Sequence, residues 1–462
     1  MKQRDYTPLM AELAAAYAKH STKSAKLHKK ALKYLIDGGS HSLRLLKPFP
    51  PRIVKAQGAW LEDEDGHRIL DFWQGHAANI LGHNPKVVTS ALAKAFKNGY
   101  GLQTGFPDRL QVEAAEILCR QTGAERVRFT TSGTLSTMYA VTLARAFTGR
   151  DLVLKVGGGW HGANPWALKG VGYHRGFDSV DSKGLPKTIT NKIMVTGFNN
   201  TEMLNDNFKK FGDRLACFIL EPVIGAGGLM PATTEYVKAA RRLTQRHKAL
   251  LILDEVISGF RFRAGSVANL YDVKPDLMCF GKAIGGGMPV AAVAGRAQIL
   301  NLVAADNPNK VNFSGGTFSG HPAAMLAAKT FMTHVVKNEN KIYSRLAKTA
   351  VKTRQTVTNA FADESLSVRF AGDRNKVLPG NSLHMLLFPH QKEHNLTTPE
   401  EIYNPAVCDI VLSNKVLQLA LLLENVFTVH GLCSTTTAHT EKDIQLLGRA
   451  CRNAARRIKP YL

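Results

Sequence analysis

One aspartate and one lysine, both within residues 249–289, occupy positions from which they could carry out chemistry on an amine. Asp254 ends a short run that is too uniformly apolar for a half-exposed strand. This run predicts a buried parallel strand whose carboxyl end presents the Asp254 carboxylate. Lys282 follows a second apolar run and precedes three glycines, which leaves its ammonium little access to water. A lysine in such surroundings is a candidate amine nucleophile.

Taken singly, each residue also fits an ordinary role, because an aspartate can cap a turn and a lysine can extend to the surface along its apolar stem. The combination favours catalysis. A buried lysine with a lowered pKa suits Schiff-base chemistry, and a buried aspartate keeps a pyridinium nitrogen protonated. These are the two protein contacts that pyridoxal 5'-phosphate (PLP) needs most. We therefore expect Asp254 and Lys282 to hold this cofactor.

The motifs LDEV at residues 253–256 and GKAIGGG at residues 281–287 resemble those of the class III aminotransferases. Within that family the chain is most similar to the branch that contains glutamate-1-semialdehyde aminomutase and β-amino-acid aminotransferases. The resemblance runs from about Gly38 to about Asp443. It implies an α/β fold, the PLP-dependent transferase fold type I, with a mostly parallel doubly wound sheet in a large domain and a smaller α/β domain. It also places Val256 at the cofactor, with Asp254 and Lys282.

The elements that must position these residues begin near residue 86, where helices alternate with short apolar strands as in a doubly wound sheet. The strand expected at residues 127–130 leads into Ser132, Gly133 and Thr134, and then into a helix that should run to about Phe147. Backbone N–H groups at a helix N-terminus bind phosphate, so we expect these three residues to hold the cofactor phosphate. The same residues would also serve as an ordinary helix cap.

Two further strand ends carry candidate residues. The strand expected at residues 152–156 runs into three glycines and then Trp160 and His161, so the indole lies in a loop rather than in a packed element. The family most often has Tyr-His-Gly at this point, and the resemblance implies that Trp160 stacks on the cofactor ring with His161 beside it. The strand expected at residues 216–220 ends at Glu221, an acid at the rim and a third catalytic candidate.

The segment NFSGGTFSGHP at residues 312–322 resembles a loop that crosses the dimer interface in this family. The resemblance implies that Thr317 binds the phosphate of the neighbouring subunit's cofactor. Gly315 and Gly316 allow close backbone approach, while residues 132–134 already occupy the phosphate position from the same chain. We therefore expect a homodimer with shared active sites.

The substrate side of the site should come from the N-terminal part of the chain. Arg44 could hold a substrate carboxylate through two hydrogen bonds, and a surface role is the alternative. Trp73 and His76 are further pocket candidates, and packing roles are the alternative for both. The segment at residues 434–440 has no arginine to receive a distal carboxylate.

This substrate half departs from the family pattern, with Leu135 where relatives usually have glutamate and with Trp160 in place of tyrosine. We therefore favour an aminotransferase that moves an amino group between an amino acid or amine and a keto acid or aldehyde. One alternative is glutamate-1-semialdehyde 2,1-aminomutase, which forms 5-aminolevulinate by intramolecular transfer. The other is a PLP-binding protein without turnover. The expected partners are a small-molecule amino donor and acceptor.

The chain divides by pattern into three segments. We predict that residues 1–85 complete the small domain and the substrate entrance, that residues 86–330 form the large PLP-binding domain, and that residues 331–462 form the C-terminal small domain. Residues 1–37 should be helical, and residues 53–72 should form a hairpin that turns at 64–66. Residues 333–361 should form a long helix that links the domains.

The 462 residues carry a formal net charge of +24, which alone would favour a polyanion-binding protein. The basic residues are spread along the chain without a recognition motif, so we do not expect nucleic-acid binding. The six cysteines form no CxxC pair and have no histidine at zinc spacing, which predicts reduced thiols and no metal site. No stretch has the roughly 20 apolar residues of a membrane span or the pattern of a secretory signal, so we expect a cytoplasmic protein with no membrane association.

Overall fold

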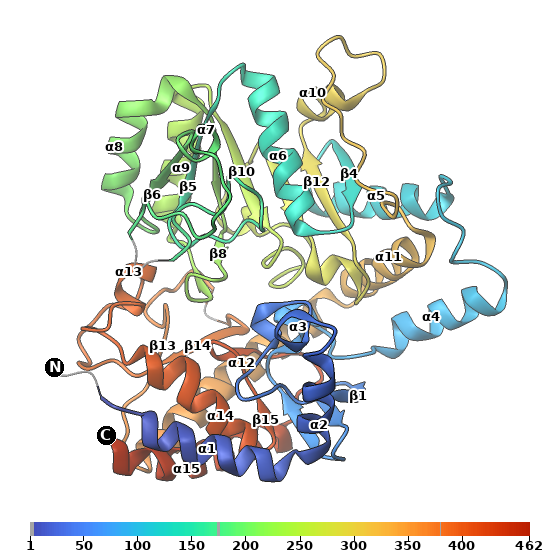
Figure 1. The fold of residues 1–462 in the computed structure, drawn as a ribbon. Coiled ribbons are helices and arrows are strands. Elements are labelled where there is room, and N and C mark those ends of the chain that lie inside the picture. Colours follow the sequence, from blue (N-terminus) through green and yellow to red (C-terminus); the bar gives the residue numbers. More distant parts are fainter. Residues whose placement is uncertain (1–3, 173–175, 379) are drawn as a thin grey trace.

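The computed structural model describes residues 4–172, 176–378 and 380–462 (Figure 1). Its centre is a seven-stranded sheet in the order β4-β12-β11-β10-β7-β5-β6. Neighbouring strands run parallel except around β12, which is antiparallel to both β11 and β4. The strands are β4 (Arg126–Thr130), β5 (Leu152–Val156), β6 (Ile193–Thr196), β7 (Leu215–Leu220), β10 (Leu250–Glu255), β11 (Leu277–Phe280) and β12 (Ala291–Gly295). The predicted mostly parallel sheet is confirmed.

Both faces of this sheet are covered, and the strand sequences are apolar on both sides as a result. In β10, Leu251 and Leu253 belong to one core cluster, while Leu250 and Ile252 belong to the other. Because neither face meets water, the pattern does not alternate. The helices of this part are α4 (Lys86–Lys97), α5 (Arg109–Thr122), α6 (Gly133–Thr148), α7 (Lys187–Thr190), α8 (Thr201–Phe211), α9 (Thr234–Arg246), α10 (Ala297–Leu300) and α11 (Pro322–Lys337). A separate pair of short strands is β8 (Val223–Ile224) with β9 (Met230–Pro231).

Local signals fix both ends of α6, the helix that follows the expected phosphate-binding residues. The Ser132 hydroxyl accepts a hydrogen bond from the Leu135 N–H at 3.3 Å, which caps the first turn. Gly149 ends the helix in the left-handed conformation with φ 66°, which glycine adopts without a steric penalty. The helix therefore begins directly after β4, where its N-terminus faces the strand ends.

The second part of the molecule combines the two ends of the chain (Figure 1). Leu9 and Phe72 share a core cluster with Val357 and Ile444, and β3 pairs in parallel with β15. Its strands are β1 (Ile53–Gln57), β2 (Trp60–Asp63), β3 (Arg68–Asp71), β13 (Arg369–Phe370), β14 (Leu383–Leu387), β15 (Val426–Phe427) and β16 (Gly431–Ser434). Its helices are α1 (Thr7–His20), α2 (Thr22–Ala31), α3 (Gln74–Ala77), α12 (Glu339–Ala362), α13 (Pro399–Ile402), α14 (Leu417–Leu423) and α15 (Glu441–Ile458).

Three expected elements are interrupted in the structure. The N-terminal helix breaks at Ser21, a buried residue with φ −124°, into α1 and α2. The expected hairpin is a three-stranded meander, because Gly58 has φ 60° and makes an additional turn between β1 and β2. The long linking helix breaks at Asn338, where φ is −118°, so α11 ends there and α12 begins. In each case a single residue leaves the regular backbone, and the apolar pattern on either side does not reveal the break.

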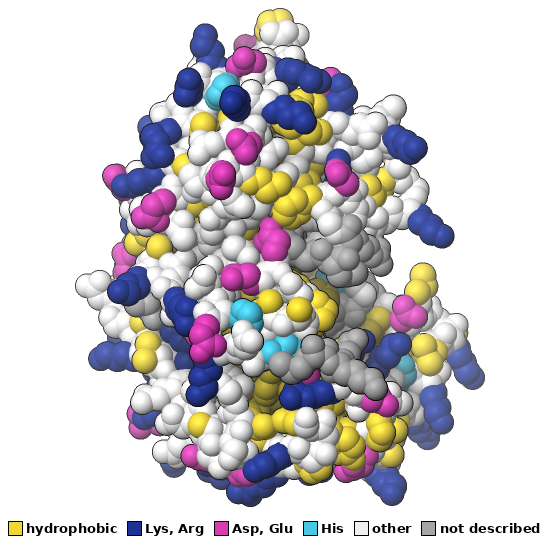
Figure 2. Space-filling model, turned by 90° about the vertical axis from the view of Figure 1, so that its left-hand side faces the viewer, with side chains coloured by type: hydrophobic (Ala, Val, Ile, Leu, Met, Phe, Trp, Pro, Cys, Tyr) yellow, Lys and Arg dark blue, Asp and Glu magenta, His cyan; other side chains and the backbone are white. Residues whose placement is uncertain are grey.

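Lysine and arginine side chains are spread over the face seen in Figure 2, with acidic side chains between them. None of the helices in the described part of the chain is long and apolar enough to cross a lipid bilayer.

Candidate active site

A cavity of about 670 Å³ lies at the carboxyl ends of β4, β5, β7 and β10, a size typical of small-molecule sites. Most of the predicted site residues line it: Arg44, Trp73, Ser132, Gly133, Thr134, Trp160, His161, Glu221, Asp254, Val256 and Lys282. Two predicted residues, His76 and Thr317, are not among its lining residues. The fold thus brings together side chains that are far apart in the sequence.

Asp254 is held in one orientation at the end of β10. Its Oδ2 lies 2.7 Å from Nδ1 of His161, and its Oδ1 accepts a hydrogen bond from the Val256 N–H at 3.1 Å. Burial lowers the pKa of His161, and the Asp254 carboxylate opposes this shift. The Nε2 atom of His161 is buried without a hydrogen-bond partner among the described residues. A His161 ring that donates from Nδ1 keeps the Asp254 carboxylate aimed into the cavity.

Lys282 begins a short 3-10 turn (Lys282–Gly285) directly after β11. Its φ is 45°, a left-handed conformation that costs a residue with a side chain roughly 1–2 kcal/mol. Burial lowers the pKa of its amine, while the carboxylates of Asp254 and Glu221 oppose the shift. Within the described residues, no hydrogen bond or ion pair engages the Lys282 amine, which leaves its nitrogen available to react.

The N-terminus of α6 forms a cradle that only small residues can build. The N–H groups of Gly133 and Thr134 have no partner within the helix, as at every helix start. A Cβ atom on Gly133 would lie 2.8 Å from Cγ1 of Val256, and one on Gly162 would lie 2.4 Å from Oγ1 of Thr134. The close packing of these residues leaves backbone donors and hydroxyls facing the cavity, which fits the phosphate of PLP.

Trp160 lies in the loop after β5, and its side chain is 44% exposed. Its backbone N–H donates to Oε1 of Glu221 at 2.8 Å, and the Gly225 N–H donates to Oε2 at 2.9 Å. Burial, and secondarily the charge of Asp254, raises the pKa of Glu221 to about 8. Because both carboxylate oxygens accept backbone hydrogen bonds, Glu221 is bound to the loop that carries Trp160.

The substrate side is built on an unusual turn that the sequence did not reveal. Residues 74–77, which form α3, have φ values of 49°, 61°, 58° and 60°, so this turn is left-handed. Asp71 holds its start, because Oδ1 accepts from the Trp73 N–H at 2.7 Å and Oδ2 from the Gln74 N–H at 3.0 Å. His76 packs against Trp73 with ring centroids 4.6 Å apart. Burial, followed by the charge of Lys282, lowers the pKa of His76 to about 3.

Among the lining residues that the sequence did not reveal are the polar side chains of Asn79 and His83 on the substrate side. His83 Nε2 lies 2.7 Å from Oδ2 of Asp71, and Asn79 Nδ2 lies 3.2 Å from Nδ1 of His83. The left-handed turn brings these three side chains together, and its only local sign in the sequence is Gly75. Gly75, followed by His83 at the end of an apolar segment, was the one feature of the sequence that could have indicated this part of the site.

Comparisons with known proteins agree with this geometry. The model of the family described as aminotransferase class III matches residues 45–370. A glutamate-1-semialdehyde 2,1-aminomutase from Thermodesulfovibrio yellowstonii is 36% identical over 76% of this chain and 82% of its own length. Another from Laribacter hongkongensis is 40% identical over 60% of this chain and 65% of its own length, slightly under two thirds of that protein.

Solved structures of transaminases share the fold of this chain. The omega-transaminase from Sphaerobacter thermophilus has a TM-score of 0.83 and 26% identity, with 94% of this chain and 98% of that one covered. The β-phenylalanine aminotransferase from Variovorax paradoxus has a TM-score of 0.83 and 25% identity, with 97% of both chains covered. The fold is therefore the PLP-dependent transferase fold type I, as expected from the sequence. The chain belongs to the class III aminotransferase family, whose members are enzymes that use pyridoxal 5'-phosphate.

Proposed function

We propose that this enzyme is an aminotransferase in which Lys282 is the covalent nucleophile and the proton carrier. The observation that carries the proposal is the Lys282 amine, which lines the cavity with the carboxyl groups of Asp254 and Glu221 and makes no hydrogen bond with the described residues. When bound, PLP supplies an aldehyde that condenses with amines and a ring that withdraws electrons. The Lys282 amine would hold the cofactor in the absence of substrate. When a substrate amine takes its place, Nζ of Lys282 would move a proton at the substrate carbon that bears the nitrogen.

The other cavity residues would hold the cofactor in place. Asp254 keeps a proton on the ring nitrogen, because His161 and the Val256 N–H fix its carboxylate. Ser132, Gly133 and Thr134 bind the phosphate at the N-terminus of α6. Trp160 covers one side of the ring, and Val256 lies beside Gly133 on the cavity wall.

Arg44, Trp73 and His76 would form the substrate side. Arg44 lines the cavity at the end of a short 3-10 turn (Ser42–Arg44), and its guanidinium suits a substrate carboxylate. Trp73 also lines the cavity, whereas His76 supports the ring of Trp73. We infer that the amino donor is an amino acid rather than a simple amine.

Conversion of the cofactor spectrum tests the aminotransferase. The purified enzyme, mixed with single amino acids and amines in turn, should lose its visible cofactor absorbance with at least one donor. Addition of a keto acid should restore that absorbance and yield a new amino acid. If no donor changes the spectrum of an enzyme that retains its cofactor, the protein binds PLP without turnover and the proposal is wrong.

A second candidate is glutamate-1-semialdehyde 2,1-aminomutase, because curated relatives at 34–40% identity carry that name. A mutase must retain its intermediate for a second half-reaction, whereas a transferase releases a product between the two halves. Glutamate-1-semialdehyde, supplied without any amino acceptor, decides between them. Formation of 5-aminolevulinate would establish the mutase. Its absence, with amino donors still converted, would establish the transferase.

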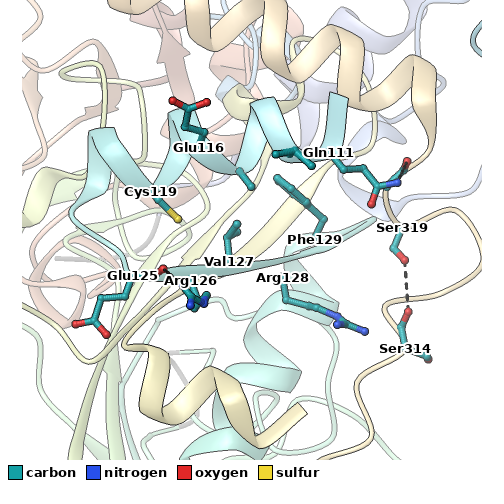
Figure 3. A pocket seen from close by; sticks show the side chains of 13 residues that line it. Gln111, Glu116, Cys119, Glu125, Arg126, Val127, Arg128, Phe129, Ser314 and Ser319 are labelled. Atoms are coloured by element: carbon teal, nitrogen blue, oxygen red, sulfur yellow. Dashed lines mark hydrogen bonds between the residues drawn. The ribbon is translucent and has the colours of Figure 1, made fainter. Parts of the chain in front are cut away.

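We also propose a homodimer in which Thr317 completes the partner's phosphate site. Thr317 is exposed and lies outside the cavity of its own chain. The segment that carries Thr317 contributes Ser314, Ser319 and Gly320 to an open groove of about 660 Å³, whose other walls come from α5 and β4 (Figure 3). Large apolar side chains are exposed on these elements and their neighbours: Leu102, Phe106, Val112 and Phe318. A second copy of the chain would cover them.

Mixing two inactive variants tests this arrangement. Lys282→Ala chains and Thr317→Ala chains should form hybrid dimers with one intact site, built from Lys282 of one chain and Thr317 of the other. Loss of the Thr317 hydrogen bond should weaken cofactor binding on the order of 10- to 100-fold. If the subunits exchange and no activity returns, Thr317 acts within its own chain or not on the cofactor.

We propose further that residues 1–85, 86–330 and 331–462 act as the substrate-entrance segment, the large domain and the small domain. The shared core of the two chain ends supports this division. We also propose the cytoplasm as the location, because the six cysteines are free thiols in the structure. Cell fractionation with an antibody to the native protein checks the location; recovery in a secreted fraction would contradict it.

A further inference from the structure

The peptide unit between Gly159 and Trp160 is held from both ends by two buried ionisable side chains. Its carbonyl, on Gly159, accepts a hydrogen bond from Nζ of Lys155 at 3.0 Å. Its N–H, on Trp160, donates to Oε1 of Glu221 at 2.8 Å. Lys155 belongs to β5 and Glu221 directly follows the neighbouring strand β7, so the two groups reach the loop from adjacent strands.

Lys155 uses all of its hydrogen-bonding capacity on this loop. It is 0% exposed, and its ammonium donates to the carbonyls of Gly159 at 3.0 Å, Ala167 at 2.9 Å and Lys169 at 2.8 Å. An ammonium has three donors, so none remains. Burial lowers the pKa of Lys155 to about 7, while the charges of Glu221 and Asp181 oppose the shift. A buried lysine in β5 makes the protein less stable than an apolar residue at the same position would. Its presence there indicates that Lys155 has a role in holding the loop.

The glycines of this loop have no side chains, so backbone hydrogen bonds hold them: the N–H groups of Gly157, Gly158 and Gly159 donate to the carbonyls of Thr196, Gly170 and Val156. Residues 157–159 are all glycine, and Gly158 has φ 75°. Glycine has the largest conformational freedom of any residue. The Trp160 side chain that follows is 44% exposed, so packing restrains it only in part. The direction of the indole therefore depends on how firmly the Gly159–Trp160 peptide is held.

We propose that Lys155 and Glu221 act as positioning residues that clamp the Gly159–Trp160 peptide and thereby fix the Trp160 indole over the cofactor ring. The inference rests on the proposed function in one respect, namely the contact of Trp160 with the ring. The clamp itself is independent of that contact, because both hydrogen bonds belong to the protein alone.

Hydrogen–deuterium exchange of the holoenzyme tests the clamp directly. Lys155→Met keeps the length of the side chain and removes its three donors. Glu221→Gln keeps the shape, but its amide oxygen can accept only one of the two backbone N–H groups. Each variant should speed exchange of the amides in residues 157–170 by about 10-fold or more and should weaken the visible circular dichroism of the bound cofactor. Lys192→Met, at an exposed pair with Asp151, is the matched control and should change neither.

The double variant distinguishes a clamp from two independent contacts. Because both side chains hold one peptide, the exchange rates of Lys155→Met/Glu221→Gln should be little faster than those of either single variant. Effects that multiply would overturn the proposal, as would unchanged exchange in either folded single variant. If Lys155→Met does not fold, Glu221→Gln alone decides by the same exchange criterion.

Trp160→Ala separates this inference from the proposed function. If its cofactor affinity equals that of the native enzyme while the clamp variants still loosen residues 157–170, the clamp stands and the ring contact of Trp160 is wrong. If the clamp variants leave the loop unchanged while Trp160→Ala loses cofactor, the ring contact stands and the clamp is wrong.

Discussion

The two sides of the cavity are built in different ways. On the cofactor side, Asp254 lies at the end of a buried strand, Lys282 follows another, and Gly133 begins the helix that follows β4. Backbone and side-chain hydrogen bonds fix the orientation of the acids there. On the substrate side, Arg44 is exposed and α3 is a left-handed turn. The positions of the cofactor-side residues depend on the central sheet, and the positions of the substrate-side residues depend on turns in the N-terminal part of the chain.

This difference indicates how substitutions on each side of the cavity should affect the enzyme. Residues at the strand ends are positioned by the core of the protein, so the chemistry they perform is coupled to folding. Residues in turns are positioned by a few local hydrogen bonds, such as those of Asp71 to the start of α3. Turns can be altered without loss of the core. We therefore expect substitutions on the cofactor side to affect catalysis with every substrate, and substitutions on the substrate side to affect particular substrates.

Lys282→Ala should have the largest effect. Without its amine there is no nucleophile and no proton carrier, so kcat should fall by roughly 10³-fold or more with every amino donor. Steady-state assays with several donors measure this. Lys192→Ala, at an exposed lysine, should retain native rates. A substrate-dependent loss in Lys282→Ala would contradict the proposed division between the two sides.

Asp254→Asn should come next. The amide keeps the size of the carboxylate but lacks its charge, so it stabilises the protonated ring nitrogen less, and kcat should fall about 10²-fold with all donors. Single-turnover measurement of the first half-reaction isolates this step. Asp151→Asn is the control, since its carboxylate pairs with Lys192 at the surface. Native rates in Asp254→Asn would show that the ring nitrogen lies elsewhere.

Arg44→Ala should be selective. Removal of the guanidinium should raise KM about 10-fold for amino acids and leave simple amines unaffected, because only the former carry a carboxylate. Comparison of an amino acid with its decarboxylated amine measures the difference. Arg456→Ala, at an exposed side chain on α15, serves as the control. Equal losses for both substrates would mean that Arg44 supports the fold and does not contact the carboxylate.

Glu221→Gln should change the pH dependence of stability. Burial raises the folded-state pKa of Glu221 to about 8, so the folded protein retains a proton that the unfolded chain releases from about pH 4.5 upward. The free energy of unfolding therefore falls as pH rises from about 4.5 to 8, by at most about 1.4 kcal/mol per pH unit. The charges of Lys282, Lys155 and Asp254 act on the same carboxyl group.

Glutamine does not titrate, so the variant should show a flatter profile in urea unfolding between pH 5 and 8. Identical slopes in the native and variant proteins would show that Glu221 is ionised throughout this range. In that case the pKa of the Glu221 carboxyl group would not be raised in the folded protein.

The cofactor side could be predicted because strand ends are visible in a sequence. An apolar run that stops at Asp254 or before Lys282 locates the end of a buried strand, and neighbouring parallel strands end at the same edge. The sequence did not predict a functional role for Lys155, because this residue lies inside an apolar run and not at its end. Its side chain was therefore counted with the apolar residues of the strand. Glu221 was expected as a catalytic residue; it lines the cavity, where its two oxygens accept hydrogen bonds from the backbone N–H groups of Trp160 and Gly225.

The substrate side could be predicted only in part. Arg44 and Trp73 were expected at the cavity and line it, whereas Asn79 and His83 line it and were not expected. Their positions depend on four consecutive residues with positive φ, and only one of these is glycine. Positive φ at residues other than glycine leaves almost no trace in a sequence. The backbone conformation of α3, and the positions of the substrate-side residues that depend on it, therefore could not be predicted from the sequence.

Borohydride reduction of the holoenzyme, followed by peptide mapping, tests the central claim most directly. Reduction should fix the cofactor to the protein through one lysine, and mass spectrometry should find the modified side chain at Lys282 in the peptide that spans residues 281–287. The same treatment of Lys282→Ala should leave the cofactor removable. A reduced adduct at Lys155, at any other lysine, or in Lys282→Ala would contradict the assignment of the nucleophile.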